Sequence, residues 1–474
     1  MSAGSRTGRF SSETSESRPI PKSPFVLIAG AGLGGLTMAL LLEQANINYA
    51  VFERAAKVKP LGAAIAMTPN ILPIFRQLNL LDELLRFCIP GKDLDVYREN
   101  MTRIGGIEGE YYKKITGYDT VFFWRPALYD WLLSKIPASK IHMGKKILAI
   151  QQSEEGVKMR CSDNTGYTGD ILIGADGAYS GVRQSLYKQL DQQGLLPEED
   201  RKEMPMTYVC MVGTTKSLDP EKYPELKDPH SHFSTVLGKG KPHSWTTITL
   251  RDNKISWGVM LQLGDEASAD MMFRNSEWGP EANKSMLDEI YNFPIKNGGI
   301  LGDLIEATDK DLISKVYVEE KLFQTWNHGR VALMGDGAVS AMQDAVVLAN
   351  CLYDIEEATQ ENIEAALTDY RAQRIGHVTV QVNMSKMMGK AMFGQKWTER
   401  LMRNIMYNMP KWLQSKAHLQ AAAYRPNIAF LPPVPNTTNL KLEPQKPSKR
   451  YMREQAERAK VASMVSMVSS TVAI

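Results

Sequence analysis

Three acidic residues stand directly after short, continuous apolar runs of the kind that buried parallel strands show. A carboxylate at the end of such a strand can accept hydrogen bonds from the hydroxyl groups of a bound sugar. Residues of this type in this position predict a site for a ligand that carries several hydroxyls. The three acids are Glu53, Asp176 and Asp336.

The first acid ends the second of two predicted strands, and a glycine-rich turn follows the first. The apolar run Phe25–Ala29 leads into GxGxxG, formed by Gly30, Gly32 and Gly35. The first glycine permits the tight turn, the second lets the backbone approach a pyrophosphate, and the third lets helix and strand pack closely. Glu53 follows 18 residues after Gly35, where it can bind a ribose and disfavours a 2′-phosphate. This pattern predicts the adenosine half of FAD or NAD and leaves the choice between them open.

The other two acids favour a flavin. Asp176 follows the apolar run in ILIGADGAYSGVR, which spans residues 171–183, and Asp336 ends the run RVALMGD. The ribityl chain of a flavin offers several hydroxyls to a carboxylate, whereas NAD has no such chain. The sequence therefore indicates FAD.

These motifs, in this order, resemble the class A flavoprotein monooxygenases, which are single-component aromatic hydroxylases and epoxidases. The resemblance covers about residues 24–385, and the segments YRPNIAFLPPVPN and QDAVVLANCLYD are similar to the fungal branch that acts on meroterpenoids and indole diterpenes. It implies an FAD-dependent monooxygenase of secondary metabolism that uses NADPH or NADH and dioxygen to hydroxylate or epoxidise a hydrophobic aromatic or prenylated small molecule. The motif DGxxSxVR is matched at Asp176, Gly177, Ser180, Val182 and Arg183.

The resemblance also assigns roles to single residues. It implies that the GxGxxG glycines lie at the pyrophosphate and that Glu53 binds the adenosine ribose. Asp336 would bind the ribityl hydroxyls, and Asp176-Gly177 would lie between the flavin pyrophosphate and the path of the nicotinamide cofactor. For Asp176 the alternative is a turn acid that caps its own loop.

Two more segments are similar to parts of the family's site. FFWRPALYDWLL resembles a helix whose leading arginine, here Arg125, reaches the FAD phosphates, and Pro126 suits a first helical turn. The alternative for Arg125 is a solvated arginine at a helix start. PLGAAIAMTPN resembles the loop over the flavin, with Gly62 and Ala63 closest to it.

The chain departs from the family after Asp336. There the family has a loop with His, Pro and glycines, of which roughly a dozen residues are absent here, and with them much of the anion-binding backbone. Two explanations stay open. A mis-predicted exon boundary has shortened the sequence, or the short connection is real and Ser340 caps the following helix.

The predicted fold is α/β: a glutathione-reductase-type FAD-binding fold with a Rossmann-like parallel sheet, an antiparallel β-sheet substrate domain and C-terminal helices. Within the substrate domain, Trp245, Trp257 and Val259 are candidates to line the pocket, and core packing is the alternative. The predicted divisions are a disordered tail (1–23), the FAD-binding domain (24–200 and 310–385), the substrate domain (201–309), a C-terminal helical region (386–429) and a Pro-rich and polar tail (430–474).

Composition excludes several classes of protein. With 56 basic and 53 acidic residues, the net charge of +3 gives no basic stripe for nucleic acid. The cysteines lie far apart without CxxC, and no histidines stand at ligand spacing, so we expect neither a metal site nor disulfides. No signal peptide and no transmembrane helix are recognisable, which predicts an intracellular protein, cytoplasmic or peripheral on an internal membrane. The cysteines are Cys88, Cys161, Cys210 and Cys351.

The Met-rich C-terminal helices offer an apolar surface for a bulky isoprenoid or for peripheral contact with a membrane, with ordinary helix packing as the alternative. Two alternatives to the monooxygenase also remain: a flavin- or NAD-dependent dehydrogenase, and a remnant or mis-spliced form with impaired FAD binding. No Ser-His-Asp, HExxH or Cys-His constellation is present, which fits chemistry carried by the cofactor, so no catalytic side chain is expected.

Overall fold

The structure is a computed structural model that describes residues 23–239, 242–263, 280–296, 298–394, 396–410, 413, 419 and 421–472. The tail predicted at residues 1–23 lies outside the described residues except for Ser23.

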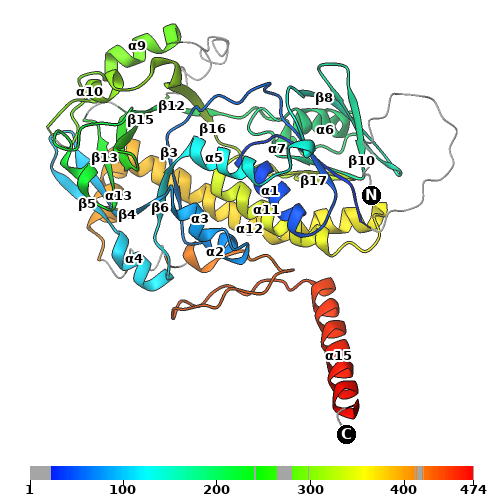
Figure 1. Ribbon diagram of the computed structural model, residues 1–474. Coiled ribbons are helices and arrows are strands. Elements are labelled where there is room, and N and C mark those ends of the chain that lie inside the picture. The colour runs from blue at the N-terminus through cyan, green and yellow to red at the C-terminus, as the bar shows by residue number, and fades with distance from the viewer. Residues whose placement is uncertain are drawn as a thin grey trace.

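A six-stranded sheet forms the centre of the first half of the molecule (Figure 1). Its neighbouring strands pair in parallel except at one edge, where β17 runs antiparallel to β18. The apolar runs that precede the three predicted acids are β2, β11 and β18, so their carboxyl ends meet at one edge. The strands, in sheet order, are β17 (Asn327–His328), β18 (Val331–Leu333), β11 (Ile171–Gly174), β1 (Val26–Ala29), β2 (Tyr49–Phe52) and β7 (Ile141–His142).

Both faces of this sheet are covered, as the continuous apolar strands require. On β1, Val26 and Ile28 point into one core and Leu27 and Ala29 into another. The first core is closed by the helices α1 (Leu33–Gln44), α2 (Leu72–Gln77), α3 (Leu81–Leu85), α5 (Arg125–Ser134) and α11 (Ala338–Tyr353). The second is closed by α6 (Gly181–Gln192) and by a small sheet of β8 (Ile147–Ser153), β9 (Gly156–Cys161) and β10 (Gly166–Gly169).

A nine-stranded sheet forms the other half of the molecule. Its β12 to β16 part is antiparallel, as predicted, but β13 pairs in parallel with β4. The sheet is also wider than residues 201–309, because strands from residues 64–124 and from 314–319 join it. In sheet order it contains β16 (Ser314–Glu319), β12 (Met206–Thr214), β15 (Lys254–Gln262), β14 (His243–Leu250), β13 (Ser231–Leu237), β4 (Ile89–Arg98), β6 (Val121–Trp124) and β3 (Ala64–Met67), with β5 (Arg103–Glu108) beside β4.

The candidate pocket residues of this sheet belong to its core. Trp245, Trp257 and Val259 are buried under α9 (Pro280–Ile290) and α10 (Leu301–Glu306), on the covered face of the sheet. The indole nitrogen of Trp257 donates to Oγ1 of Thr308 at 2.9 Å. Core packing is therefore the correct interpretation.

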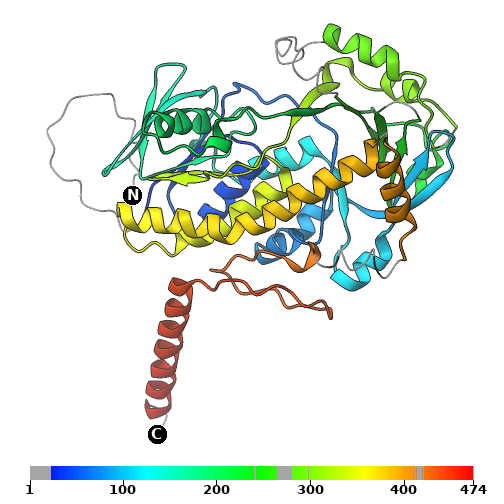
Figure 2. The same cartoon turned by 180° about the vertical axis from the view of Figure 1, so that it is seen from behind.

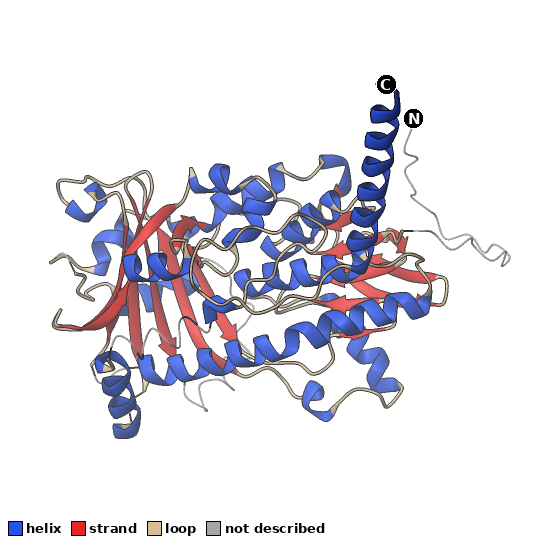
Figure 3. Ribbon diagram, turned by 90° about the horizontal axis from the view of Figure 1, so that it is seen from below, coloured by secondary structure: helices blue, strands red, loops and turns tan. Residues whose placement is uncertain are grey.

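One long helix, α12 (Gln360–Phe393), runs across the molecule and connects its two halves (Figures 2 and 3). It is followed by α13 (Trp397–Asn408), which lies against β5. Among the described residues, no helix combines the length and the apolar character needed to cross a bilayer. The shorter elements are α4 (Gly109–Thr116), α7 (Glu198–Arg201) and the 3-10 turns Ala138–Lys140, Pro224–Lys227 and Lys310–Leu312.

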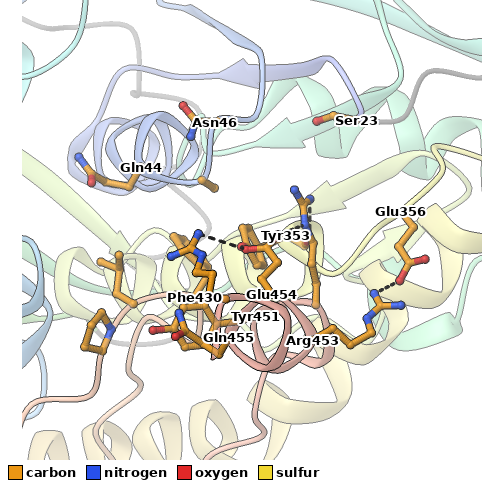
Figure 4. Close-up of a pocket in the computed structure, with 15 residues that line it drawn as sticks. Ser23, Gln44, Asn46, Tyr353, Glu356, Phe430, Tyr451, Arg453, Glu454 and Gln455 are labelled. Carbon is orange, nitrogen blue, oxygen red and sulfur yellow. Dashed lines mark hydrogen bonds and ion pairs between the residues drawn. The ribbon is translucent and has the colours of Figure 1, made fainter. Parts of the chain in front are cut away.

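The last described helix, α15 (Lys449–Val472), projects from the body (Figure 1). The composition of residues 430–474 predicts a Pro-rich and polar tail, so a helix of this length is a difference from the prediction. Its first turns are held to the body by Tyr353, which donates to Glu454 at 2.8 Å, and by the ion pair of Arg453 with Glu356 (Figure 4). A cavity of about 680 Å³ at this junction is lined by charged groups that are paired with one another.

Candidate functional site

A cleft of about 1110 Å³ opens at the carboxyl ends of the central strands of the parallel sheet. It is at the upper end of the size range of small-molecule pockets, which suits a large, elongated ligand. The three acids that the sequence singles out lie far apart along the chain, yet all of them line this one cleft. The predicted residues on its walls are Gly30, Gly32, Glu53, Arg125, Asp176, Gly177 and Asp336.

The glycine turn forms the floor of the cleft. Gly30 has φ +99°, and a Cβ there would lie 2.4 Å from the carbonyl oxygen of Ala175. A Cβ on Gly35 would lie 2.0 Å from the carbonyl oxygen of Gly30, so this residue permits the helix and the turn to touch. Gly32 has no atom within 4 Å of its Cβ position and is the N-cap of α1. Leu33 and Gly34, the first residues of α1, also line the cleft, so the helix N-terminus borders it, as an anion site requires.

Glu53 is oriented by two backbone N–H groups. Its Oε2 accepts from Ala31 at 3.0 Å, and its Oε1 accepts from Ala55 at 2.9 Å. The first of these bonds ties the carboxylate to the glycine turn, so Glu53 stands beside the floor of the cleft. Each oxygen has a second lone pair with which it can accept from a ribose hydroxyl.

Asp176 has one engaged and one unengaged oxygen. Its Oδ2 accepts from Gly181 at 2.8 Å and from Val182 at 3.3 Å, at the start of α6. Its Oδ1 is buried and has no partner among the described residues. Capping of α6 accounts for the hydrogen bonds of Oδ2 only. A buried acceptor without a partner is rare, so Oδ1 is positioned to accept from a donor that a bound ligand would supply. Ser180, the N-cap of α6, accepts from Arg183 at 2.9 Å.

Helix α5 contributes two residues to the cleft. Arg125 donates to the carbonyl oxygen of Leu61 at 3.1 Å, and burial lowers its pKa, so it is more than a solvated arginine. Tyr129, one turn further on, also lines the cleft, and its hydroxyl is buried without a partner among the described residues. Burial and the nearby Glu53 raise the pKa of Tyr129. No motif in the sequence singles out Tyr129, although its i, i+4 spacing from Arg125 is a usable signal.

The segment at Gly62 and Ala63 lies beside Arg125 rather than on the cleft wall. A Cβ on Gly62, which has φ +123°, would lie 3.0 Å from Cδ of Arg125. Ala63 accepts from the backbone N–H of Arg125 at 3.2 Å. Leu61 is the residue of this segment that lines the cleft.

The connection after Asp336 is short and exposed. Helix α11 begins at Ala338, with Gly337 as N-cap and no side-chain cap. The suggestion that Ser340 caps the helix is therefore wrong, because Ser340 already lies in its first turn. Its hydroxyl instead accepts from Nη2 of Arg374 at 3.3 Å. Asp336 itself is exposed at the mouth of the cleft.

A buried ion pair holds this connection from beneath. Asp344 accepts from the backbone N–H of Gly335 at 2.9 Å and from Nε of Arg374 at 2.7 Å. Both side chains of the pair are almost fully buried. Burial opposes the charge of Arg374, but Asp344 more than offsets this, so the pKa of Arg374 lies above its usual value. Its Nη1 is buried and has no partner among the described residues.

A second cavity, of about 620 Å³, meets the first at the Gly335–Gly337 connection. Gly177, Gly335 and Asp336 line both. The walls of the second cavity come from β12, β15, β16 and one side of α12, and its lining is largely apolar. The apolar side chains include Met204, Met260, Val318, Leu322, Phe323, Val378, Val382, Met388, Met392 and Phe393.

Known proteins resemble the chain over most of its length. Residues 25–208 match the family described as FAD binding domain. The FAD-dependent monooxygenase ausM of Emericella nidulans is 27% identical over 437 residues, which cover 86% of this chain and 87% of that one. The FAD-dependent monooxygenase atmM of Aspergillus flavus is 25% identical over 431 residues, 86% of each chain.

Solved structures share the fold. Klebsiella pneumoniae HpxO, complexed with FAD and uric acid, gives a TM-score of 0.69 at 20% identity, over 85% of this chain and 97% of that one. A salicylate hydroxylase substrate complex gives 0.59 at 16% identity, over 85% and 98%. The FAD-binding family match and the curated relatives indicate an FAD-dependent oxidoreductase. The same family match and the fungal relatives support a class A FAD-dependent monooxygenase, in agreement with the expected family, fold class and cofactor.

Proposed function

We propose that this monooxygenase uses NADPH or NADH to hydroxylate or epoxidise a hydrophobic aromatic or prenylated metabolite. The observation that carries the proposal is the meeting of two cavities at Gly177, Gly335 and Asp336. One cavity carries the acids and the glycine turn that suit a dinucleotide, and the other is the more apolar of the two and suits the molecule to be oxidised. When bound and reduced, FAD supplies the activation of dioxygen, and the chain supplies position and exclusion of water.

The polar cleft has the donors and acceptors that FAD requires. Glu53 would accept from the adenosine ribose, and the N–H groups at the start of α1 would donate to the pyrophosphate. Arg125 adds a positive charge on the opposite wall. The orphaned Oδ1 of Asp176 and the exposed carboxylate of Asp336 would accept from hydroxyls of the ribityl chain, which the two acids reach from different strands.

The apolar cavity favours a bulky substrate. Five of its lining residues are methionines, whose flexible side chains adapt to irregular shapes. They are Met204, Met260, Met334, Met388 and Met392. Polar side chains such as Arg183, Glu320 and Gln381 also line the cavity, but apolar surface predominates, so shape and apolar contact would contribute more to substrate selection than hydrogen bonds do.

We expect purified chain to oxidise NADPH or NADH faster when a prenylated indole or a prenylated phenol is present. The rate would be followed as loss of nicotinamide absorbance together with oxygen uptake, and the product would be heavier by one oxygen atom. Consumption of NADH without oxygen uptake would instead identify a dehydrogenase, and oxygen uptake without a modified product would contradict the proposed substrate class.

The short connection after Asp336 favours a second candidate, a form with impaired FAD binding. Gly335, Asp336 and Gly337 are exposed, so little backbone covers the place where the two cavities meet. We expect the chain to leave gel filtration with less than one FAD per molecule and to regain flavin when FAD is added. A chimera that carries, between Asp336 and Gly337, the segment of a fungal relative should retain FAD. Stoichiometric, tightly held flavin in the unaltered chain would refute this prediction.

A further inference from the structure

Helix α13 presents apolar residues on two sides. One side packs on the body, where Tyr407 lies against Gly105 of β5. The other side carries Trp397, Leu401 and Ile405, which are 75%, 50% and 56% exposed. These three stand at i, i+4 and i+8, so they form one stripe along the helix. A tryptophan and two branched aliphatic residues at this exposure are an apolar surface that some partner should cover.

The end of α12 that leads into α13 has a similar stripe. Val380, Met384 and Met387, at i, i+4 and i+7, are 61%, 43% and 40% exposed. Other residues of this stretch, such as Met388 and Met392, line the apolar cavity. Figure 2 shows α12 and α13 on the same outer side of the molecule, with no other element drawn in front of them.

The charge around these stripes is almost entirely positive. Residues 380–410 contain five basic side chains and a single acid, Glu399. Glu399 accepts from the backbone N–H of Lys396. A helix with Trp, Leu and Ile on one side and Lys and Arg around them is typical of a helix that lies in a membrane interface. A protein partner fits less well, because lysine is depleted in protein interfaces. The basic residues are Lys386, Lys390, Lys396, Arg400 and Arg403.

We infer that α13 and the exposed stripe of α12 form a peripheral binding surface for an anionic lipid bilayer. Trp397, Leu401 and Ile405 would enter the boundary between headgroups and acyl chains, and the surrounding Lys and Arg would contact anionic headgroups. In that position the other side of α12 holds the apolar cavity next to the bilayer. An apolar substrate dissolved in lipid would then have a short route to the site, and this last consequence rests on the proposed function.

The test is sedimentation of the full chain with vesicles, without substrate, so its result does not depend on the proposed reaction. One vesicle is phosphatidylcholine alone and the other is phosphatidylcholine mixed with phosphatidylserine. We expect binding to the mixed vesicles that weakens as salt is added. The triple variant Trp397→Gln, Leu401→Gln, Ile405→Gln should bind them at least about tenfold more weakly.

A matched control tests whether vesicle binding depends on the α13 stripe or on exposed apolar side chains in general. Leu148, on β8 at the cleft, and Leu195, in the loop after α6, are 49% and 59% exposed, so Leu148→Gln with Leu195→Gln should bind vesicles as the unaltered chain does. The variant Lys396→Glu, Arg400→Glu should lose binding to the mixed vesicles, whereas its behaviour with vesicles of phosphatidylcholine alone should not change. Because all these side chains are exposed, the thermal unfolding midpoints should agree among the variants.

Three results would overturn the inference. The first is absence of binding to either vesicle. The second is a truncation of residues 461–474 that abolishes vesicle binding while the α13 triple variant leaves binding unchanged. That result would assign the lipid contact to residues 461–474. The third is a dimer, measured by light scattering in the absence of lipid, that the triple variant dissociates, because a second copy would then cover the stripe.

Discussion

Gly32→Ala is expected to weaken FAD binding at least about tenfold, which corresponds to about 1.4 kcal/mol. Gly32 lines the cleft at the start of α1, and a Cβ there would point into open space that the pyrophosphate should occupy. The same change should alter the free energy of unfolding of the FAD-free chain by less than about 1 kcal/mol, because a poorer N-cap is offset by a less flexible unfolded chain. Flavin fluorescence titration and urea unfolding measure the two quantities separately.

Gly35→Ala is the matched comparison, since the same methyl group is added three residues away. Its Cβ would lie 2.0 Å from the backbone oxygen of Gly30, where neither atom can move without shifting the turn. We expect a loss of about 3 kcal/mol or more in the free energy of unfolding. Equal losses of stability in the two variants, or unchanged FAD affinity in Gly32→Ala, would contradict the placement of the pyrophosphate at Gly32.

The cleft was predictable where its chemistry is local in the sequence. The glycine turn and Glu53 are separated by one helix, and each has a requirement that few residue types meet. Asp176 and Asp336 were predictable because both follow buried strands of one parallel sheet, whose ends meet at one edge. The assignment of these residues to parts of FAD stays a prediction, which the glycine variants test.

Other parts depend on contacts that the local sequence does not carry. The parallel pairing of β4 with β13 joins residues near 95 to residues near 235, and no turn between them specifies the register. The mixed sheet therefore extends beyond the predicted substrate domain. Helix α15 was missed because its first turns are strongly charged and follow a Pro-rich segment, a composition that favours an irregular tail.

The buried pair of Asp344 and Arg374 was missed for a related reason. Charged residues on a helix are usually solvated, and 30 residues separate these two in the chain. Only the packing of α12 on α11 brings these two side chains together, away from solvent. Their contact with the backbone of Gly335 was the least predictable part of the candidate site.

Arg374→Met is expected to destabilise the protein by about 3–5 kcal/mol, the range for removing one partner of a buried ion pair. The substitution keeps a long apolar stem in place but leaves the Asp344 carboxylate buried without its counter-charge. The measurement is the free energy of unfolding in urea. Arg453→Met is the control, because Arg453 and Glu356 are both 57% exposed and their ion pair should contribute little to the free energy of unfolding.

The double variant Asp344→Asn, Arg374→Met separates loss of charge balance from loss of packing. The introduced asparagine has no charge to leave uncompensated, and its side-chain oxygen can still accept from the N–H of Gly335. We therefore expect the double variant to recover most of the lost stability. If the network acts by holding Gly335 and Asp336 in place, Arg374→Met should also weaken FAD binding, and the double variant should recover this affinity as well. A double variant that is folded and stable yet still binds FAD as poorly as Arg374→Met would show that the guanidinium acts on the cofactor's site directly. If Arg374→Met lowers the free energy of unfolding no more than Arg453→Met does, the ion pair does not stabilise this connection, because a buried carboxylate without its counter-charge should be strongly destabilising.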